Sequence, residues 1–436
     1  MNLLGVALRL TCAWLVVTIP VEAAEGVPRS ISLPQALQRA LAANPRLTAA
    51  ERDIGIATGL KVQAGALPNP DLAFELDNAL GSGPFKGLQA AETTLQLSQL
   101  VELGGKREAR LAAGEAGVGA AVWQRRATRL EVMSETAVAF ITVVSVQRRI
   151  EIFDEQISSL EQLIPLLQKR VQEGASSPAE TLRAQVAADL FRVDRERAKT
   201  ELATARRDLA ILMGDSTPRF GAAVGRLTGI GQPPPFWSVV QAIEANPQLM
   251  RWTAVTAQRN ADLILARLKR IPDVQISAGW RHFQETVEFS GGQPRQFTND
   301  NAVRLGVSVP LPIFDQNTGN IIAAEDALAK TGAERAINKL VLISVAGRAY
   351  DAVNGSLAEL KLLRTSVIPS ARSALETIQS GYLQGRFTLL DLLDVRGSVL
   401  QALLREQEAL RNFHIAVATI EGLVGSPFSL TRESSR

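Results

Sequence analysis

The stretch that decides the fold is Tyr382–Arg396, YLQGRFTLLDLLDVR, because it has the pattern of a turn between two long helices. One helical run ends at Gly385, and a new helix starts after Thr388, whose side chain suits an N-cap. Asp391 lies three residues after this cap, at the spacing of a capping box, and Asp394 follows three residues later. The stretch therefore predicts a tight tip between two helices.

The same arrangement occurs earlier in the chain, as Gly174-Ala-Ser-Ser-Pro-Ala-Glu180. Its cap is Ser177, followed by a proline at the first helical position and by Glu180 at the third. The two stretches align without a gap when Gly174 is placed on Gly385. The chain is therefore predicted to contain two copies of one long helical hairpin.

The composition agrees with long helices. Of the 436 residues, 46% are hydrophobic, 5% are aromatic and 21% are charged, with a net charge of +3. So few aromatic residues favour helices over a conventional sheet protein, and the balance of charge argues against a nucleic-acid-binding protein. The two histidines, His282 and His414, lie far apart and the methionines are scattered, so we expect no metal site and no cofactor.

A short apolar run, Leu10–Ile19, lies near the N-terminus and is too short to span a bilayer. Arg9 precedes it and a small-residue site at Ala23 follows it, which predicts a cleaved signal peptide over residues 1–23. A membrane-surface helix is the alternative. Cys12, the only cysteine, is read as an apolar residue of this signal, with lipid attachment as the less favoured reading.

Two segments switch from helical to alternating periodicity, each after an Asn-Pro helix restart and a proline-containing turn. They are the expected strand hairpins 71–101 and 273–311, with loops at Ala79–Ala91 and Gly291–Asn301. Alternation fits either a half-buried sheet of a soluble protein or a membrane barrel with apolar residues facing lipid. Four strands cannot close a barrel, which needs about eight, so a barrel would require several copies of the chain.

Long helices are predicted for residues 105–173 and 319–384, with return helices at 178–213 and 389–424. At about 1.5 Å per residue, the first long helix would span on the order of 100 Å. Apolar residues recur at heptad steps in the second return helix, which indicates a coiled-coil seam. Helices of this length need neighbours along their whole length, because one small core cannot cover them.

These elements divide the mature chain into two structural repeats, over residues 24–213 and 237–425. The segment 214–236, rich in glycine and proline, is expected to be a linker that crosses the waist of the molecule. The polar residues 426–436 are expected to form a disordered tail.

This order of elements resembles the TolC family of outer-membrane efflux proteins over essentially the whole mature chain. Tyr382–Asp394 looks like the second tip of that family, with a tyrosine, a glycine three residues on and two acidic residues three apart. Glu92–Arg107, ETTLQLSQLVELGGKR, is similar to the heavy-metal-efflux branch typified by CzcC and CusC. In that branch an ELGGKR turn leads from the second strand into the long helix.

The resemblance implies a mainly α fold with a small membrane β part. Three chains would each contribute four strands to one twelve-stranded barrel in the outer membrane, and their helices would form a tunnel across the periplasm. It implies a homotrimer in contact with outer-membrane lipid, docked by a periplasmic adaptor (membrane fusion) protein onto an inner-membrane RND-type pump. The implied function is an exit channel for divalent heavy-metal cations rather than an enzyme.

Two alternatives stay open. An exit duct for drugs or for type I secreted proteins would have the same barrel and tunnel. A periplasmic coiled-coil scaffold without a pore would leave the four alternating strands unexplained. An enzyme is not favoured, because the sequence offers no candidate nucleophile or acid/base pair.

By the same resemblance, Asp391, Asp394 and Tyr382 form a closed periplasmic gate. Threefold symmetry would place three copies of each aspartate around one axis, and a ring of negative charge in a constriction favours cations. Helix capping and the helix dipole also explain Asp391 well and Asp394 less well. Capping and gating are compatible roles for these residues.

The resemblance further implies that both helix tips contact the adaptor, the alternative being exposed turns without a partner. The residues expected at this contact are Gly174, Ser177, Gly385, Arg386 and Phe387. Relatives can carry a basic residue where this chain has Phe387, which argues against a gate-locking ion pair there. Arg281 and Arg304 fall on strand positions expected to face the lumen, where they would tune ion flow, although polar residues in a water-filled lumen need no such role.

Overall fold

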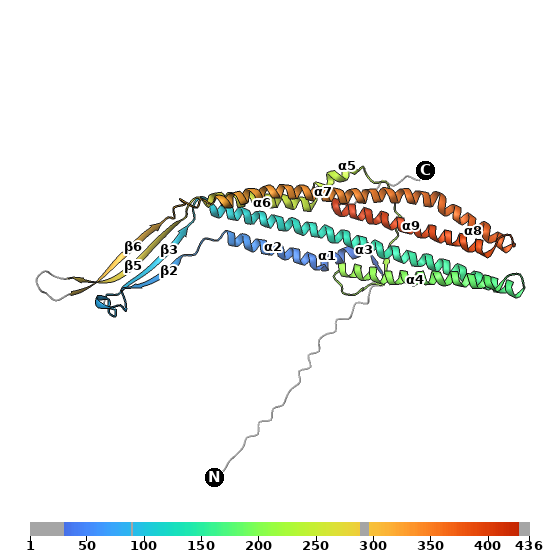
Figure 1. Cartoon of the computed structure of the whole chain (residues 1–436), viewed down its shortest axis with the longest axis horizontal. Coiled ribbons are helices and arrows are strands. Elements are labelled where there is room, and N and C mark those ends of the chain that lie inside the picture. The colour runs from blue at the N-terminus through green and yellow to red at the C-terminus, as the bar shows by residue number, and fades with distance from the viewer. Residues whose placement is uncertain (1–29, 89, 288–295, 427–436) are drawn as a thin grey trace, which may run out of the picture.

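The structure, a computed structural model, describes residues 30–88, 90–287 and 296–426. The expected signal peptide, Cys12 and the expected tail from residue 427 onward lie outside the described residues. The protein is elongated, with a β-sheet at one end and two helical turns at the other, and long helices run between them (Figure 1).

The elements come in two similar series, each of which runs from short helices through a strand hairpin to a long helix and a return helix. The first series comprises β1 (Ser30–Ser32), α1 (Leu33–Ala43), α2 (Pro45–Ala64), β2 (Asp71–Asp77), a 3-10 turn (Gly83–Phe85), β3 (Glu92–Val101), α3 (Lys106–Gln172) and α4 (Pro178–Leu212). After a linker strand β4 (Ala222–Val224), the second comprises α5 (Phe236–Ile243), α6 (Pro247–Leu268), β5 (Val274–Val287), β6 (Gln296–Ser308), α7 (Thr318–Leu362), a π-helical turn (Leu363–Val367), α8 (Ile368–Leu383) and α9 (Leu389–Val424).

The four strands of the two hairpins form one antiparallel sheet in the order β2-β3-β5-β6. The register aligns apolar residues across all four strands, because Phe74 pairs with Leu95, Leu95 with Trp280 and Trp280 with Val303. These rows lie on one exposed face of the sheet, whereas the opposite face includes buried polar side chains such as Thr94. The sheet therefore presents an apolar face that the chain itself does not cover.

The second strand hairpin is longer than the sequence predicts. Residues 296–301 were expected in a loop but belong to β6, where Asn301 pairs with His282 and Asn299 with Gln284. Backbone pairing in an antiparallel hairpin does not need apolar side chains. The polar residues therefore extend the strands beyond the apolar rows. Alternation of apolar residues alone places the start of β6 several residues too late.

The helices form one layer in which each contacts its neighbours in a fixed order. Next to the sheet the order is α2, α3, α6 and α7, and toward the tips it is α4, α3, α9 and then α7 with α8. Within the described residues, α3 is the one helix long and apolar enough to cross a membrane. It packs against α2, α4, α6 and α9, so it is the central helix of this layer.

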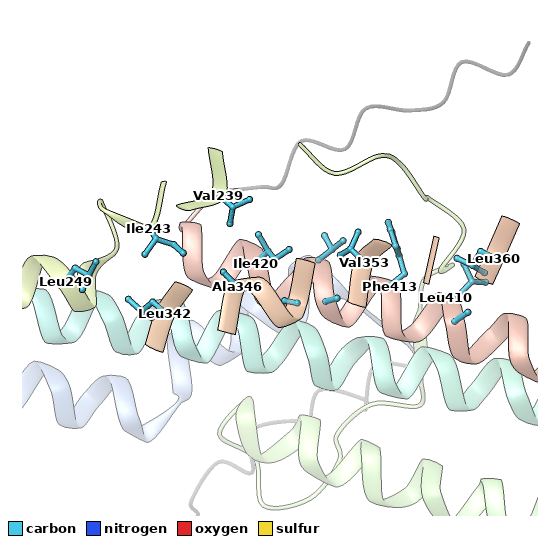
Figure 2. Packing of buried hydrophobic residues seen from close by; sticks show 14 residues of the cluster. Val239, Ile243, Leu249, Leu342, Ala346, Val353, Leu360, Leu410, Phe413 and Ile420 are labelled. Atoms are coloured by element: carbon cyan, nitrogen blue, oxygen red, sulfur yellow. The ribbon is translucent and has the colours of Figure 1, made fainter. Parts of the chain in front are cut away.

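The largest core lies at mid-length, where α5 and α6 cover α7 and α9 (Figure 2). Phe413 and Ile420 of α9 are fully buried against Val353 and Ala346 of α7. A related cluster in the first repeat joins α1, α3 and α4 to the linker around Phe220. Each repeat thus has its own core at the same level of the molecule.

The repeated Asn-Pro signal marks a matched pair of buried caps. Asn44 Oδ1 accepts a hydrogen bond from the Arg46 backbone amide at 2.9 Å, and the Asn44 side-chain amide donates to the Leu212 carbonyl at 2.9 Å. Asn246 makes the corresponding bonds, accepting from the Gln248 amide at 2.7 Å and donating to the carbonyl oxygen of Leu423. Each asparagine therefore starts one helix and satisfies the end of a return helix.

Two further features depart from the sequence prediction. The linker contains β4, which pairs in parallel with β1 at the start of the first repeat. The helical run 319–384 is also interrupted by the π-helical turn Leu363–Val367, just before Pro369. Proline lacks the amide hydrogen that an α-helix would use at this point, although α3 contains Pro165 without such a turn.

Candidate functional site

The two helix tips share one backbone geometry. Gly174 and Gly385 adopt positive φ angles of 71° and 75°, which glycine tolerates without steric cost. The amide of the next residue then bonds back to the preceding helix, from Ala175 to the Arg170 carbonyl and from Arg386 to the Gly381 carbonyl, each at 2.8 Å. This is the Schellman arrangement that ends a helix in a tight turn.

The caps of the return helices differ between the two tips. Thr388 and Asp391 close a full capping box, in which the Thr388 amide donates to the Asp391 carboxylate at 2.9 Å and the Asp391 amide donates to Thr388 Oγ1 at 3.2 Å. The Thr388 hydroxyl also donates to this carboxylate at 2.7 Å. Hydrogen bonds from the Thr388 side chain and then from its backbone hold the pKa of Asp391 below its usual range.

At the first tip, Ser177 caps α4 by accepting from the Ala179 amide at 3.2 Å. Glu180 was expected to mirror Asp391, but its carboxylate reaches across to the second hairpin. There it accepts a hydrogen bond from the Tyr382 hydroxyl at 3.0 Å. The longer side chain of glutamate permits this contact, and the symmetry expected between the two tips is therefore wrong for these two acids.

Tyr382 joins the two hairpins just behind their tips. Its side chain is 4% exposed and packs with Leu163, Leu167, Leu389 and Leu392. Burial, followed by the hydrogen bond to the Glu180 carboxylate, raises the pKa of Tyr382. The phenol therefore stays protonated and continues to donate this bond at any ordinary pH.

Arg170 adds a second link between the hairpins. Its guanidinium donates to the Tyr382 carbonyl at 3.3 Å and lies over the Tyr382 ring, with 5.1 Å between Cζ and the ring centroid. A cation above an aromatic face is attracted by the ring quadrupole. Tyr382 is thus held from α3 and from α4 at once.

The remaining tip residues point away from this core. Asp391 and Asp394 are both exposed, and within the described residues no hydrogen bond or ion pair reaches the Asp394 carboxylate. Phe387 lies against α8, where a Cβ on Gly381 would overlap its ring. Arg386 is exposed and donates to the Gln384 side chain. The second tip therefore presents acidic, basic and aromatic groups on one exposed turn.

Arg396 is a functional candidate that sequence reasoning missed. It lies on α9, close to the tip, and is 5% exposed. Its guanidinium donates to the Ser159 hydroxyl of α3 and has no carboxylate partner within the described residues. Burial lowers the pKa of Arg396 below its usual value. Arg396 occupies a heptad position that an apolar residue normally fills, and an arginine there is expected to be exposed. The sequence pattern therefore did not predict its burial.

The sheet places Arg281 and Arg304 on the polar face, opposite the exposed apolar rows. Arg281 forms an ion pair with Glu92 of β3, and Glu92 also accepts from Asn78 at 3.0 Å. Arg304 pairs across strands with Gly279. Within the described residues, no group of three or more His, Cys, Asp or Glu side chains is arranged to hold a metal ion.

The ELGGKR turn joins the sheet to the helices through the second repeat. Lys106 is 6% exposed and donates to the Asp273 carboxylate at 2.7 Å and to the Ile271 carbonyl at 2.6 Å. The Leu103 amide also donates to Asp273, at 3.1 Å. Glu102 accepts from Arg110 at 2.8 Å, which lowers the pKa of Glu102 and raises that of Arg110. This motif thus fixes the first long helix to the start of the second hairpin.

Comparisons with known proteins agree with this geometry. A family model described as outer membrane efflux protein matches residues 36–215 and 239–426. The chain is 27% identical over 395 residues to the cobalt-zinc-cadmium resistance protein CzcC of Cupriavidus metallidurans, covering 91% of this chain and 90% of that protein. It is also 27% identical over 319 residues to the nickel and cobalt resistance protein CnrC of the same organism, covering 72% and 71%.

A crystal structure of CusC matches with a TM-score of 0.75 over 90% of this chain and 92% of that chain, at 16% identity. The TolC-like channel fold expected from the tips and hairpins is therefore confirmed, as is a location in the outer membrane with helices that span the periplasm. The matched residues include both repeats and omit most of the linker. The chain belongs to the outer membrane efflux protein family.

Proposed function

We propose that three copies of this chain form the outer-membrane exit channel of a tripartite efflux system, and that the channel passes divalent heavy-metal cations. In this proposal the protein is a passive conduit without a catalytic role. A periplasmic adaptor and an inner-membrane RND-type pump supply selection and energy.

The observation that carries the channel is the four-stranded sheet with an uncovered apolar face. Leu72, Phe74, Val303 and Leu305 all lie on that face and are exposed in the single chain. Within the described residues, β2 and β6 have no strand on their outer edges. Lipid covers such a face, and pairing β6 of one copy with β2 of the next would give three copies a closed barrel of about twelve strands.

The helical layer supports the same closure. Next to the sheet, its edge helix α2 exposes Ile56, Leu60 and Val62, and α7 at the other edge exposes Ile322, Ile337 and Leu340. Edges that differ in this way join head to tail, and such contacts close into a ring when the rotation permits. Three copies would then surround a tunnel that continues the barrel.

The gate in this proposal lies at the helix tips. Rings of three Asp391 and three Asp394 carboxylates would favour cations where the tunnel narrows. The bond between Tyr382 and Glu180 would hold the two hairpins of each copy together in the closed state. The tip residues Gly174, Ser177, Gly385, Arg386 and Phe387 would receive the adaptor, and Arg281 and Arg304 would line the barrel.

The cargo is proposed from the relatives. CzcC and CnrC carry names of resistance to cobalt, zinc, cadmium and nickel, and the acidic tip suits divalent cations. A drug or type I secretion duct is the alternative, because the barrel and tunnel would be the same. A soluble scaffold without a pore would leave the uncovered apolar face of the sheet exposed to water.

The deciding experiment measures cellular accumulation in a deletion strain. Cobalt, nickel, zinc, cadmium and a fluorescent drug are loaded separately, with and without the restored gene. Metal retained only in the deletion strain supports the metal channel, whereas retention of the drug alone overturns the metal assignment. If neither is retained, conductance of the purified protein in planar bilayers separates a channel from a scaffold.

A further inference from the structure

One aromatic side chain projects from the protein where the sheet meets the helices. Phe314 follows β6 and is 99% exposed, and Leu311 and Ile313 beside it are also exposed. The segment is anchored just behind the ring, because the Asn317 side chain donates to the Ala266 carbonyl at 2.7 Å and Arg270 Nε donates to the Gln316 carbonyl at 3.0 Å. The ring is therefore presented on a fixed support.

A groove of about 760 Å³ lies at the same junction between sheet and helices, beside the opposite edge of the sheet. The segment from Leu67 to Pro70, which leads into β2, lines the groove together with Leu100 and Val101 of β3 and Arg107 of α3. Gln99 donates to the Pro68 carbonyl at 2.9 Å and so holds this wall over β3. Leu67 is 69% exposed, and the lining also includes the charged residues Glu102, Lys106 and Glu108. The groove therefore has an exposed apolar wall and a charged side.

The ring and the groove lie beside opposite edges of the sheet. Phe314 follows β6, the groove wall precedes β2, and these two strands are the outer strands of the sheet. The register aligns Asp71 with Gly306 through β3 and β5, so both features lie just beyond the same end of the sheet. Building on the proposed ring of copies, we propose that Phe314 of each copy docks into this junction groove of the next copy.

Arg107 and Asp315 provide one pair of opposite charges across the two surfaces. Arg107 donates to the Gly65 carbonyl from Nε at 2.7 Å, but within the described residues no carboxylate pairs with it. Asp315, directly after Phe314, accepts from the Asn317 amide at 2.8 Å, and no described basic side chain pairs with it. Docking would bring these opposite charges to one interface.

Site-specific photo-cross-linking tests the docking in the full-length protein in its own outer membrane. The photoreactive amino acid p-benzoylphenylalanine replaces Phe314 and, as the control, the exposed Phe85 of the loop between β2 and β3. After irradiation, adducts are mapped by mass spectrometry in cells that express isotopically light and heavy copies together. An amine-reactive cross-linker applied in parallel reports whether trimers are present.

The expected result is a light–heavy adduct from position 314 to residues 67–70 or 99–108 of another copy, with none from position 85. Trimers whose adducts map elsewhere, to the same copy or to lipid, would overturn the docking while leaving the proposed channel intact. If no trimer is captured by either reagent, both the docking and the proposed channel fail.

A charge exchange gives a second, independent readout. Arg107→Asp and Asp315→Arg should each lower, by several degrees, the temperature at which the detergent-resistant trimer dissociates. The double variant should recover most of that loss. Losses that simply add in the double variant would show that these two side chains do not meet.

Discussion

The Tyr382 hydroxyl donates a 3.0 Å hydrogen bond to the Glu180 carboxylate, across 202 residues of sequence. This bond connects the second hairpin to the first at their narrow end, next to the exposed carboxylates of Asp391 and Asp394. In the proposed channel, a bond at this place would limit how far the two hairpins separate. It is therefore the first contact to remove by mutation in a test of the proposed gate.

Tyr382→Phe should favour the open state. The ring and its packing are retained, but a bond to a charged acceptor worth about 1.5–3 kcal/mol is lost, which is roughly ten- to hundredfold in the open-to-closed ratio of each copy. Single-channel recordings in planar bilayers should show longer openings. Tyr350→Phe is the matched control, because Tyr350 packs against Phe236 far from the tips, and an equal effect there would contradict the assignment.

The same bond should be insensitive to pH until alkaline conditions. The pKa of Tyr382 is raised in the folded protein, so its contribution is fully present below the ordinary tyrosine pKa of about 10 and is lost as pH rises through the folded value. Wild-type open probability should therefore stay flat from pH 6 to pH 9 as far as this bond is concerned. Tyr382→Phe should remove any rise seen above about pH 10.

Asp391→Asn should lower the preference for cations while leaving the helix cap largely intact, because asparagine can still accept from the Thr388 amide. The pKa of Asp391 lies below its usual range, so its charge is present above the ordinary aspartate pKa of about 3.9 and is lost only as pH falls through the lower folded value. Reversal potentials in a salt gradient should show the loss of selectivity. Asp53→Asn, on exposed α2, should leave them unchanged.

Asp273→Ala should destabilise the protein strongly. The substitution removes the carboxylate that pairs with the buried Lys106 ammonium, and within the described residues the ammonium keeps its hydrogen bond to the Ile271 carbonyl. Breaking a buried ion pair in this way lowers the free energy of unfolding by about 3–5 kcal/mol. Lys106→Met should cost less, because Asp273 keeps the Leu103 amide and is more exposed. Urea unfolding of the detergent-solubilised protein measures both.

The control for this pair is Glu325→Ala, which removes a surface ion pair with Arg267. Exposed pairs of this kind contribute about 0–1 kcal/mol. The double variant Lys106→Met with Asp273→Ala should lose less stability than the sum of the two single variants. Simple additivity would show that the pair is not coupled.

Gly214→Ala should be far more harmful than Gly174→Ala. Both glycines have positive φ angles, of 83° and 71°, and alanine in that region costs roughly 1–2 kcal/mol. At Gly214 a Cβ would also lie 2.5 Å from the Ala43 carbonyl oxygen, whereas at Gly174 no atom lies within 4 Å. The yield of folded protein in the outer membrane and its melting temperature should separate the two, and equal losses would exclude the steric explanation.

Local signals in the sequence predicted most elements of the fold. Thr388 with Asp391, the two Asn-Pro pairs and the tip glycines act over a few residues, so their spacing alone locates the helix ends. The partner of Tyr382 could not be predicted in the same way, because Glu180 lies 202 residues away and its local pattern equally fitted a cap. The same holds for Lys106 and Asp273, whose contact depends on how the two repeats pack.

Other features of the structure have no recognisable pattern in the sequence. The three-residue strands β1 and β4 are too short for alternation to be visible, yet they pair with each other. Arg396 occupies a seam position where only the packing of α3 against α9 determines its burial. Phe314 lies between the expected strand hairpin and the expected long helix, where no periodic pattern applies, and its full exposure follows from where β6 ends and α7 begins.

The π-helical turn Leu363–Val367 has a mechanical consequence. Within the described residues it occurs in the second hairpin alone, while α3 of the first hairpin runs as one α-helix past Pro165. A wider turn with weaker backbone bonds bends more readily than an α-helix. Each copy thus combines one hairpin whose long helix is continuous with one whose long helix can bend at the π-helical turn. In a ring of three copies, rigid and bendable hairpins would alternate around the circumference. Such a ring would widen when its three second hairpins bend, while its three first hairpins keep their shape.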